Sequence, residues 1–170
     1  MAVLRRCDVA MTDATTQLLT LCQANGHVIA TAESCTGGML SAAITDIAGS
    51  SAIFDRGFVT YSNAAKQQML GVRPATLAEF GAVSEPVALE MALGAISNSN
   101  ATLAVSVTGI AGPGGSDHKP EGRVCFGIAG AGIQHIETVE FGPLGRAHVR
   151  QSAMEHALGL LLTFCKTPKK

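Results

Sequence analysis

The 170-residue sequence predicts an α/β fold, a three-layer α/β/α sandwich built on a mixed, mostly parallel sheet of about five strands. Two observations carry this prediction. Short apolar runs typical of buried strands recur along the chain, and segments of helical periodicity separate most of them. The last two strand-like runs are joined only through Gly130-Ala131-Gly132, which predicts a hairpin and therefore a mixed sheet.

The first half of the chain is expected to alternate helix and strand. Asp13 is a candidate N-cap, and Asn25-Gly26 is a typical helix stop. The segment from Gly57 to Tyr61 is rich in β-branched and aromatic side chains, which favours a strand. The expected elements are a helix at 13–25, a strand at 28–31, a helix at 37–47, a strand at 57–61 and a short helix at 63–70.

The second half continues the alternation. Ser84, with Pro86 in the first turn, predicts a helix start. The uncharged run 102–108, bounded by Gly109, predicts a strand buried on both faces. The remaining expected elements are strands at 124–129 and 133–141 and a final helix from residue 146, with an apolar stripe.

The length fits one ordinary domain, which buries roughly 70% of the surface of its unfolded chain. We expect that domain at 13–165, after a disordered extension at 1–12 and before a basic tail at 166–170. The net charge is −1 and the arginines are scattered, so no nucleic-acid partner is expected.

Composition also bounds the membrane, redox and metal possibilities. A run without charged residues extends from Glu90 to Asp117, but polar residues at 97–100 and a Gly-Pro-Gly-Gly sequence interrupt it, so we expect no membrane span. Five cysteines without Cys-x-x-Cys spacing predict reduced thiols and a cytoplasmic location. Four of the five histidines lack a histidine, cysteine or acidic partner at a usual ligand spacing, and His156 has only the adjacent Glu155, so we expect no metal. We expect no other cofactor either.

The sequence Thr-Ala-Glu-Ser-Cys-Thr-Gly-Gly at 31–38 is the strongest candidate for a site. It places two potential nucleophiles, Ser34 and Cys35, between an expected strand and an expected helix. The first turn of a helix exposes N–H groups that attract anions or a developing oxyanion. A purely structural alternative is that Ser34 caps the helix.

Four motifs in order resemble those of the CinA C-terminal-domain family. They are the sequence at 31–38, Gly-Phe-Val-Thr-Tyr-Ser-Asn at 57–63 followed by Lys66, Gly-Ala-Val-Ser-Glu-Pro at 81–86, and Thr-Gly-Ile-Ala-Gly-Pro at 108–113. The resemblance covers roughly 13–164. It implies an amidase that hydrolyses the carboxamide of nicotinamide mononucleotide to nicotinic acid mononucleotide and ammonia.

Amide hydrolysis without a metal needs an activated nucleophile, a proton shuttle and donors for the oxyanion. With the resemblance, Ser34 is the expected nucleophile. Cys35 is its rival, although a buried small apolar residue is the favoured interpretation of that cysteine. Lys66 is the preferred base, acting directly or through Tyr61, and partial burial would lower its pKa. Both transfer routes stay open.

The expected substrate-binding residues lie in the glycine-containing loops and at the start of the final helix. They are Glu33, Thr36, Gly37, Gly38, Thr108, Gly109, Gly112 and Arg146. Arg146 and Arg150 oppose the helix macrodipole there, so a nucleotide phosphate or an acidic side chain nearby would account for them. We expect a small-molecule nucleotide as partner and a homo-oligomer. The alternative function is a nucleotide-binding module without catalysis, linked to competence or DNA damage.

Overall fold

The computed structural model of the chain describes residues 6–116 and 118–168. A five-stranded sheet of order β2-β1-β3-β4-β5 forms its centre. The strands are β1 Ile29–Glu33, β2 Phe54–Val59, β3 Leu103–Gly109, β4 Arg123–Gly130 and β5 Ile133–Glu140. The pairs β1/β2 and β1/β3 are parallel, whereas β3/β4 and β4/β5 are antiparallel, so only β4 runs against the other strands.

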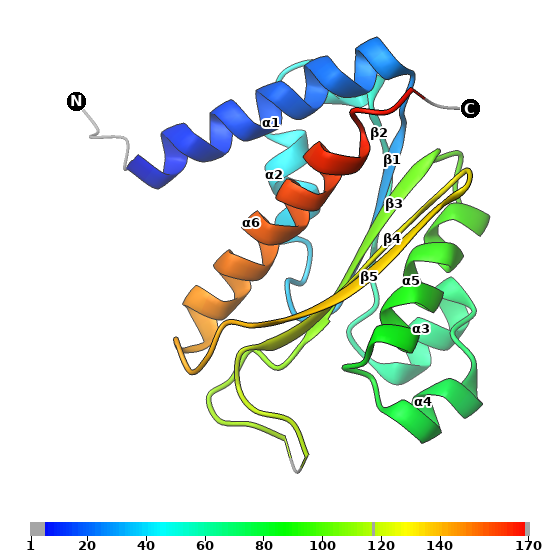
Figure 1. Cartoon of the computed structure of the whole chain (residues 1–170), viewed down its shortest axis with the longest axis vertical. Helices are drawn as coiled ribbons and strands as arrows, with labels where there is room; N and C mark the ends of the chain where they lie inside the picture. Colours follow the sequence, from blue (N-terminus) through cyan, green and yellow to red (C-terminus); the bar gives the residue numbers. More distant parts are fainter. Residues whose placement is uncertain (1–5, 117, 169–170) are drawn as a thin grey trace.

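Helices cover both faces of this sheet, which confirms the predicted three-layer α/β fold. The helices are α1 Arg6–Asn25, α2 Met39–Thr45, α3 Asn63–Leu70, α4 Pro74–Phe80, α5 Glu85–Ser97 and α6 Arg146–Phe164, with a 3₁₀ turn, η1 Ser50–Ala52. In Figure 1, α1, α2 and α6 lie on one side of the strands and α3, α4 and α5 on the other. None of the helices in the described part of the chain is long and apolar enough to cross a bilayer.

Each face of the sheet has its own apolar core. The larger core lies under α1, α2 and α6 and includes Leu40, Phe126 and Leu161. The smaller core lies under α3, α4 and α5 and includes Phe58 and Met91. Side chains alternate between the two faces along a strand, so the completely buried β1 and the nearly completely buried β3 contribute to both cores.

Several element boundaries differ from the sequence predictions. The first helix begins at Arg6, so the expected start at Asp13 is wrong and residues 6–12 belong to the helix. β2 begins at Phe54, three residues before the expected start. The helix α4, with Pro74 in its first turn, was not predicted at all. The expectations for residues 1–5 and 169–170 lie outside the described residues.

The direction of the strands determines where a site can form. Because β1, β2 and β3 run parallel, their carboxyl ends meet at one edge of the sheet, with Glu33 opposite both Val59 and Val107. The segments that follow these strands carry the polar motifs of the sequence. Loops at such an edge are the usual place for ligands in α/β folds.

Candidate active site

Ser34 lies directly after β1, at this carboxyl edge. Its N–H donates to the carbonyl of Val107 at 2.9 Å, which ties it to the neighbouring strand β3. Its own carbonyl accepts from the N–H of Gly37 at 3.1 Å, which closes a tight turn. Only 9% of Ser34 is exposed. The serine is therefore held in a defined position by its backbone, with its side chain free to meet other groups.

Lys66 reaches Ser34 from α3. The side chain of Ser62 accepts from the N–H of Ala65 at 3.0 Å and caps this helix, so Lys66 falls in its first turn. The ammonium group is 2.9 Å from the hydroxyl oxygen of Ser34 and donates to the carbonyl of Thr60 at 2.8 Å. The two side chains are thus in direct contact although 32 residues separate them in sequence.

Lys66 is 1% exposed and has no salt bridge among the described residues. Burial disfavours the charged ammonium and lowers the pKa of Lys66 from 10.5 to about 8. A useful share of the amine is then neutral near neutral pH. A neutral amine in hydrogen-bond contact with a serine hydroxyl can accept its proton.

Glu33 organises the loop between β1 and α2. One carboxylate oxygen accepts from the N–H groups of Gly38 at 3.0 Å and Leu40 at 3.1 Å. The other accepts from the N–H of Ser41 at 2.8 Å and from its hydroxyl at 2.7 Å. A carboxylate is favoured at a helix N-terminus, where N–H groups lack partners within the helix.

These contacts revise two expectations. Glu33 was expected to bind substrate. It is completely buried and both of its carboxylate oxygens accept from groups of the loop, so in this structure it positions the loop. It is also Glu33, rather than Ser34, that caps α2. Gly38 permits the turn because its φ of 100° is favourable only for glycine. Gly57 on β2 permits the contact with Ser41, since a Cβ there would lie 2.3 Å from that hydroxyl.

Arg150 holds the opposite side of the same loop. Its guanidinium, from the second turn of α6, donates to the carbonyls of Cys35 and Thr36, both at 3.0 Å. The expected phosphate or acidic partner of Arg150 is therefore replaced by backbone oxygens. The N–H of Thr36 points away from Arg150, because the N–H and C=O of a trans peptide point in opposite directions. Within the described residues, no backbone carbonyl accepts from the N–H of Cys35 or of Thr36.

Cys35 is a weak competitor for the role of nucleophile. It is 5% exposed and packs in the larger core, beneath α6. Burial raises the pKa of its thiol from 9.0 to about 11. A thiol that stays protonated near neutral pH is a poor nucleophile, so the structure favours the interpretation of Cys35 as a small core residue.

Tyr61 lies near the edge, but its hydroxyl is not among the hydrogen-bond partners of Ser34 or Lys66 in the described part of the chain. Its side chain is largely exposed, and its hydroxyl accepts from Arg146 at 2.8 Å. The same guanidinium donates to the carbonyl of Gly112 at 3.0 Å. Arg146 thus links the end of β2, the glycine-rich loop and the start of α6. The contact of Lys66 with Ser34 is direct and needs no tyrosine relay.

The glycine-rich loop after β3 is partly occupied by the protein itself. The carboxylate of Glu121 accepts from the N–H of Gly114 at 2.6 Å and from that of Gly145 at 2.9 Å. Thr108 donates its hydroxyl to the carbonyl of Ala82 at 2.8 Å. Gly109 serves packing, because a Cβ there would lie 2.7 Å from Val124. Sequence reasoning missed Glu121, because a lone acidic residue carries no motif. It also assigned no role to Thr60, although this residue lies within the motif at 57–63.

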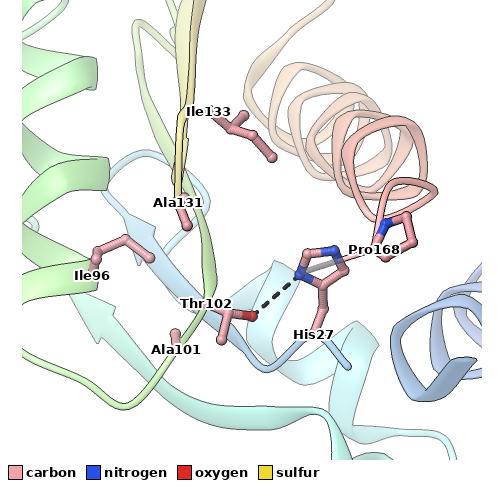
Figure 2. Close-up of a pocket in the computed structure, with 8 residues that line it drawn as sticks. His27, Ile96, Ala101, Thr102, Ala131, Ile133 and Pro168 are labelled. Carbon is pink, nitrogen blue, oxygen red and sulfur yellow. Dashed lines mark hydrogen bonds between the residues drawn. The ribbon is translucent and has the colours of Figure 1, made fainter. Parts of the chain in front are cut away.

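The described residues line two notable cavities, one near the carboxyl edge of the sheet and one near the opposite edge. One, of about 520 Å³, lies between the α4–α5 connection and the glycine-rich loop and is lined by residues such as Val83, Ile110 and Lys119. The other, of about 310 Å³, includes His27 and Thr102 in its lining and lies where β1 and β3 begin (Figure 2). The second cavity is at the far end of the strands from Ser34 and does not belong to the site.

No group of three or more histidine, cysteine or acidic side chains that could hold a metal occurs in the described part of the chain. The groups that this edge offers are a buried serine and lysine in contact, the N–H groups of Cys35 and Thr36 in the adjoining turn, and the guanidinium of Arg146.

Known proteins with the same sequence features and the same fold exist. The family model for the CinA C-terminal domain matches residues 11–165. The nicotinamide-nucleotide amidohydrolase PncC of Escherichia coli K12 is 56% identical over 140 residues, which are 82% of this chain and 85% of that protein.

Solved structures agree. The competence/damage inducible protein CihA of Agrobacterium tumefaciens superposes with a TM-score of 0.88 at 43% identity, over 96% of this chain and 98% of that one. A competence-damaged protein (CinA) superfamily protein of Escherichia coli superposes with a TM-score of 0.88 at 34% identity, over 96% of this chain and 94% of that one. The chain belongs to the CinA C-terminal domain family.

Proposed function

We propose that the protein is an amidohydrolase that converts nicotinamide mononucleotide to nicotinic acid mononucleotide and ammonia, with Ser34 as a metal-independent nucleophile. The observation that carries this proposal is the 2.9 Å contact between Ser34 and the buried Lys66, whose pKa is lowered to about 8. The name and the 56% identity of the Escherichia coli relative support the substrate.

In the first step, neutral Lys66 accepts the hydroxyl proton of Ser34 while the oxygen of Ser34 bonds to the carboxamide carbon. The carbonyl electrons move to its oxygen, which becomes an oxyanion. The N–H groups of Cys35 and Thr36, which donate to no backbone carbonyl in the described part of the chain, are the donors that we assign to it in the turn after the nucleophile. Preorganised donors of this kind typically supply about 3 kcal/mol of transition-state stabilisation each.

In the second step, protonated Lys66 gives its proton to the amide nitrogen, the C–N bond breaks and ammonia leaves. The product is an ester between the nicotinoyl carbon and Ser34. Water then hydrolyses this ester, with Lys66 accepting a proton from the water and returning one to Ser34. Lys66 is thus base in the first step, acid in the second and base again in the third.

Substrate would lie along the edge that carries Ser34. Arg146 is the group best suited to the phosphate, because its exposed guanidinium is fixed by Tyr61 and Gly112. The cavity of about 520 Å³ lies beside the glycine-rich loop, but Ser34, Lys66 and Arg146 do not line it, so the proposal does not place the substrate there. Thr36, Gly37, Gly38, Thr108 and Gly109 belong to this proposal as residues that shape the edge around the substrate, because the N–H groups of Gly37 and Gly38 and the hydroxyl of Thr108 already have partners within the protein. We also propose that the protein is cytoplasmic and forms a homo-oligomer.

The test measures ammonia released from nicotinamide mononucleotide by the purified protein. Ser34→Ala is expected to lower kcat by at least about 10³-fold, as for other nucleophile deletions. Cys35→Ala, one residue away, is the matched control and should keep most of the turnover. Unchanged turnover in Ser34→Ala would refute the serine mechanism, and nucleotide binding without any ammonia release would favour the non-catalytic module.

A further inference from the structure

Two buried hydroxyl groups at the edge have no hydrogen-bond partner. Among the described residues, the only buried side-chain nitrogen or oxygen atoms without a partner are Oγ1 of Thr36 and Oγ1 of Thr60, and both residues are completely buried. Buried hydroxyls elsewhere in the sheet, such as those of Thr31 and Ser106, do have partners. An unpartnered buried hydroxyl is costly, and in native proteins it commonly marks a bound water or ligand.

Thr60 is close to the catalytic pair. Its N–H donates to the carbonyl of Glu33 at 2.8 Å, which extends the pairing of β2 with β1 by one residue. Its carbonyl accepts from the amine of Lys66 at 2.8 Å. Alternation along the strand puts Thr60 on the same face as Phe58, whose side chain lies in the core beneath α3. Lys66 enters this face from α3, so the free hydroxyl lies on the Lys66 side of the sheet.

The amine of Lys66 also has a free position. In the described part of the chain its nitrogen has two partners, the hydroxyl of Ser34 and the carbonyl of Thr60. A protonated amine has three N–H donors, and a neutral amine has two donors and one lone pair. In either state one position is left over. A small polar molecule bound between this position and the Thr60 hydroxyl would give both groups a partner.

We propose that Thr60 is a further catalytic residue, whose hydroxyl, together with the amine of Lys66, holds the water that hydrolyses the ester on Ser34. The proposal rests on the serine mechanism above. Once ammonia has left, Lys66 is neutral and accepts a proton from this water as the water oxygen bonds to the acyl carbon. Thr60 Oγ1 accepts the second water hydrogen and so aims the remaining lone pair. The bond from carbon to the Ser34 oxygen then breaks, and Lys66 returns the proton to Ser34.

The decisive variants are Thr60→Val, which keeps the shape and removes the hydroxyl, and Thr60→Ser, which keeps the hydroxyl. In Thr60→Val we expect ammonia to appear in a rapid burst close to the enzyme concentration, followed by turnover slowed by about tenfold or more. Intact-protein mass spectrometry should then show the acylated protein. The turnover of Thr60→Ser should stay within about threefold of the wild-type rate. This loss is much smaller than the loss expected when a general acid or base is removed.

Hydroxylamine separates a role in water delivery from a role in folding. It attacks the ester in place of water, so it should raise the steady ammonia release of Thr60→Val much more than that of the wild type. Ser106→Ala is the matched control for stability, because its hydroxyl donates to the carbonyl of Ala88. That control should lower the melting temperature by about 2–4 °C, whereas Thr60→Val, which removes no protein hydrogen bond, should not.

Turnover of Thr60→Val within about twofold of wild type would overturn the proposal. A loss of turnover without acylated protein and without rescue by hydroxylamine would overturn it equally. Neither result would affect the serine mechanism, which fails only if Ser34→Ala continues to release ammonia.

Discussion

The buried amine of Lys66 should make both activity and stability depend on pH, and the variant Lys66→Met isolates the two effects. Methionine has a similar length and no charge, so it can fill the space beneath α3. Burial lowers the pKa of Lys66 from 10.5 to about 8. At pH 7 about a tenth of the amine is then neutral, compared with about 0.03% for an ordinary lysine. Loss of this base should lower kcat by at least about 10²-fold.

The stability effect has a definite sign. Below pH 8 the amine is protonated in both the folded and unfolded chain, and the folded state bears the full cost of a buried charge. Between about pH 8 and 10.5 only the unfolded chain binds the proton, so the stability of the wild type rises with pH. The difference of about 2.5 pKa units corresponds to about 3 kcal/mol. The variant also loses the hydrogen bonds from Lys66 to Ser34 and Thr60. This loss changes its free energy of unfolding by an amount that does not depend on the titration of Lys66.

Urea unfolding of wild type and Lys66→Met between pH 7 and 10.5 is the assay. Across this pH range, the free energy of unfolding of the wild type should rise by about 3 kcal/mol relative to that of the variant. In parallel, kcat/KM of the wild type should rise with pH and level off above about 8. Two stability curves that stay parallel, together with a kcat/KM that shows no inflection in this range, would refute the reasoning.

Two further variants address the loop and the guanidinium. Glu33→Gln should lower the free energy of unfolding by about 2–4 kcal/mol, measured in urea, because an amide accepts at only one of the two sites that meet N–H groups at the start of α2; a loss below about 0.5 kcal/mol would contradict this role. Arg146→Met should raise KM for nicotinamide mononucleotide by about tenfold or more. The melting temperature should fall by no more than about 2–4 °C, because both hydrogen bonds that are lost are exposed to solvent. Nicotinamide riboside, which lacks the phosphate, is the control substrate, and an equal effect on both substrates would show that Arg146 does not bind phosphate.

The layers, the order of elements and the edge that carries Ser34 could be predicted from sequence because they depend on local patterns. The helix at 63–70 was predicted with the bounds of α3, and the structure shows that Ser62 caps it and Gly71 ends it. Helix α4 was missed because seven residues hold too few apolar positions to show a period. The start of α1 was misplaced because Asp13 has the chemistry of a cap but lies inside a longer helix.

The partners within the site depend on long-range contacts and were less predictable. Tyr61 was considered as a relay because it is the only tyrosine and lies in a motif with Lys66. Its actual partner, Arg146, is 85 residues away. Arg150 likewise meets the carbonyls of Cys35 and Thr36 across more than 110 residues. These partners are determined by the way α6 packs across the loop. The sequence shows which side chains are present, but this packing could not be predicted from it.

The Ser34–Lys66 contact depends on the register between β1 and β2 more than on either residue alone. The pairing of Glu33 with Val59 extends to the hydrogen bond from Thr60 to Glu33, which brings Thr60 and the following helix α3 beside Ser34. A slip of one residue would turn the side chain of Ser34 to the face of α6, away from Lys66. The small cluster of Glu33, Ser41 and Gly57 opposes such a slip, because it joins the end of β1 to α2 at a point where only glycine on β2 fits. Substitutions at Gly57 should therefore impair catalysis through geometry, although the residue touches neither the nucleophile nor the base.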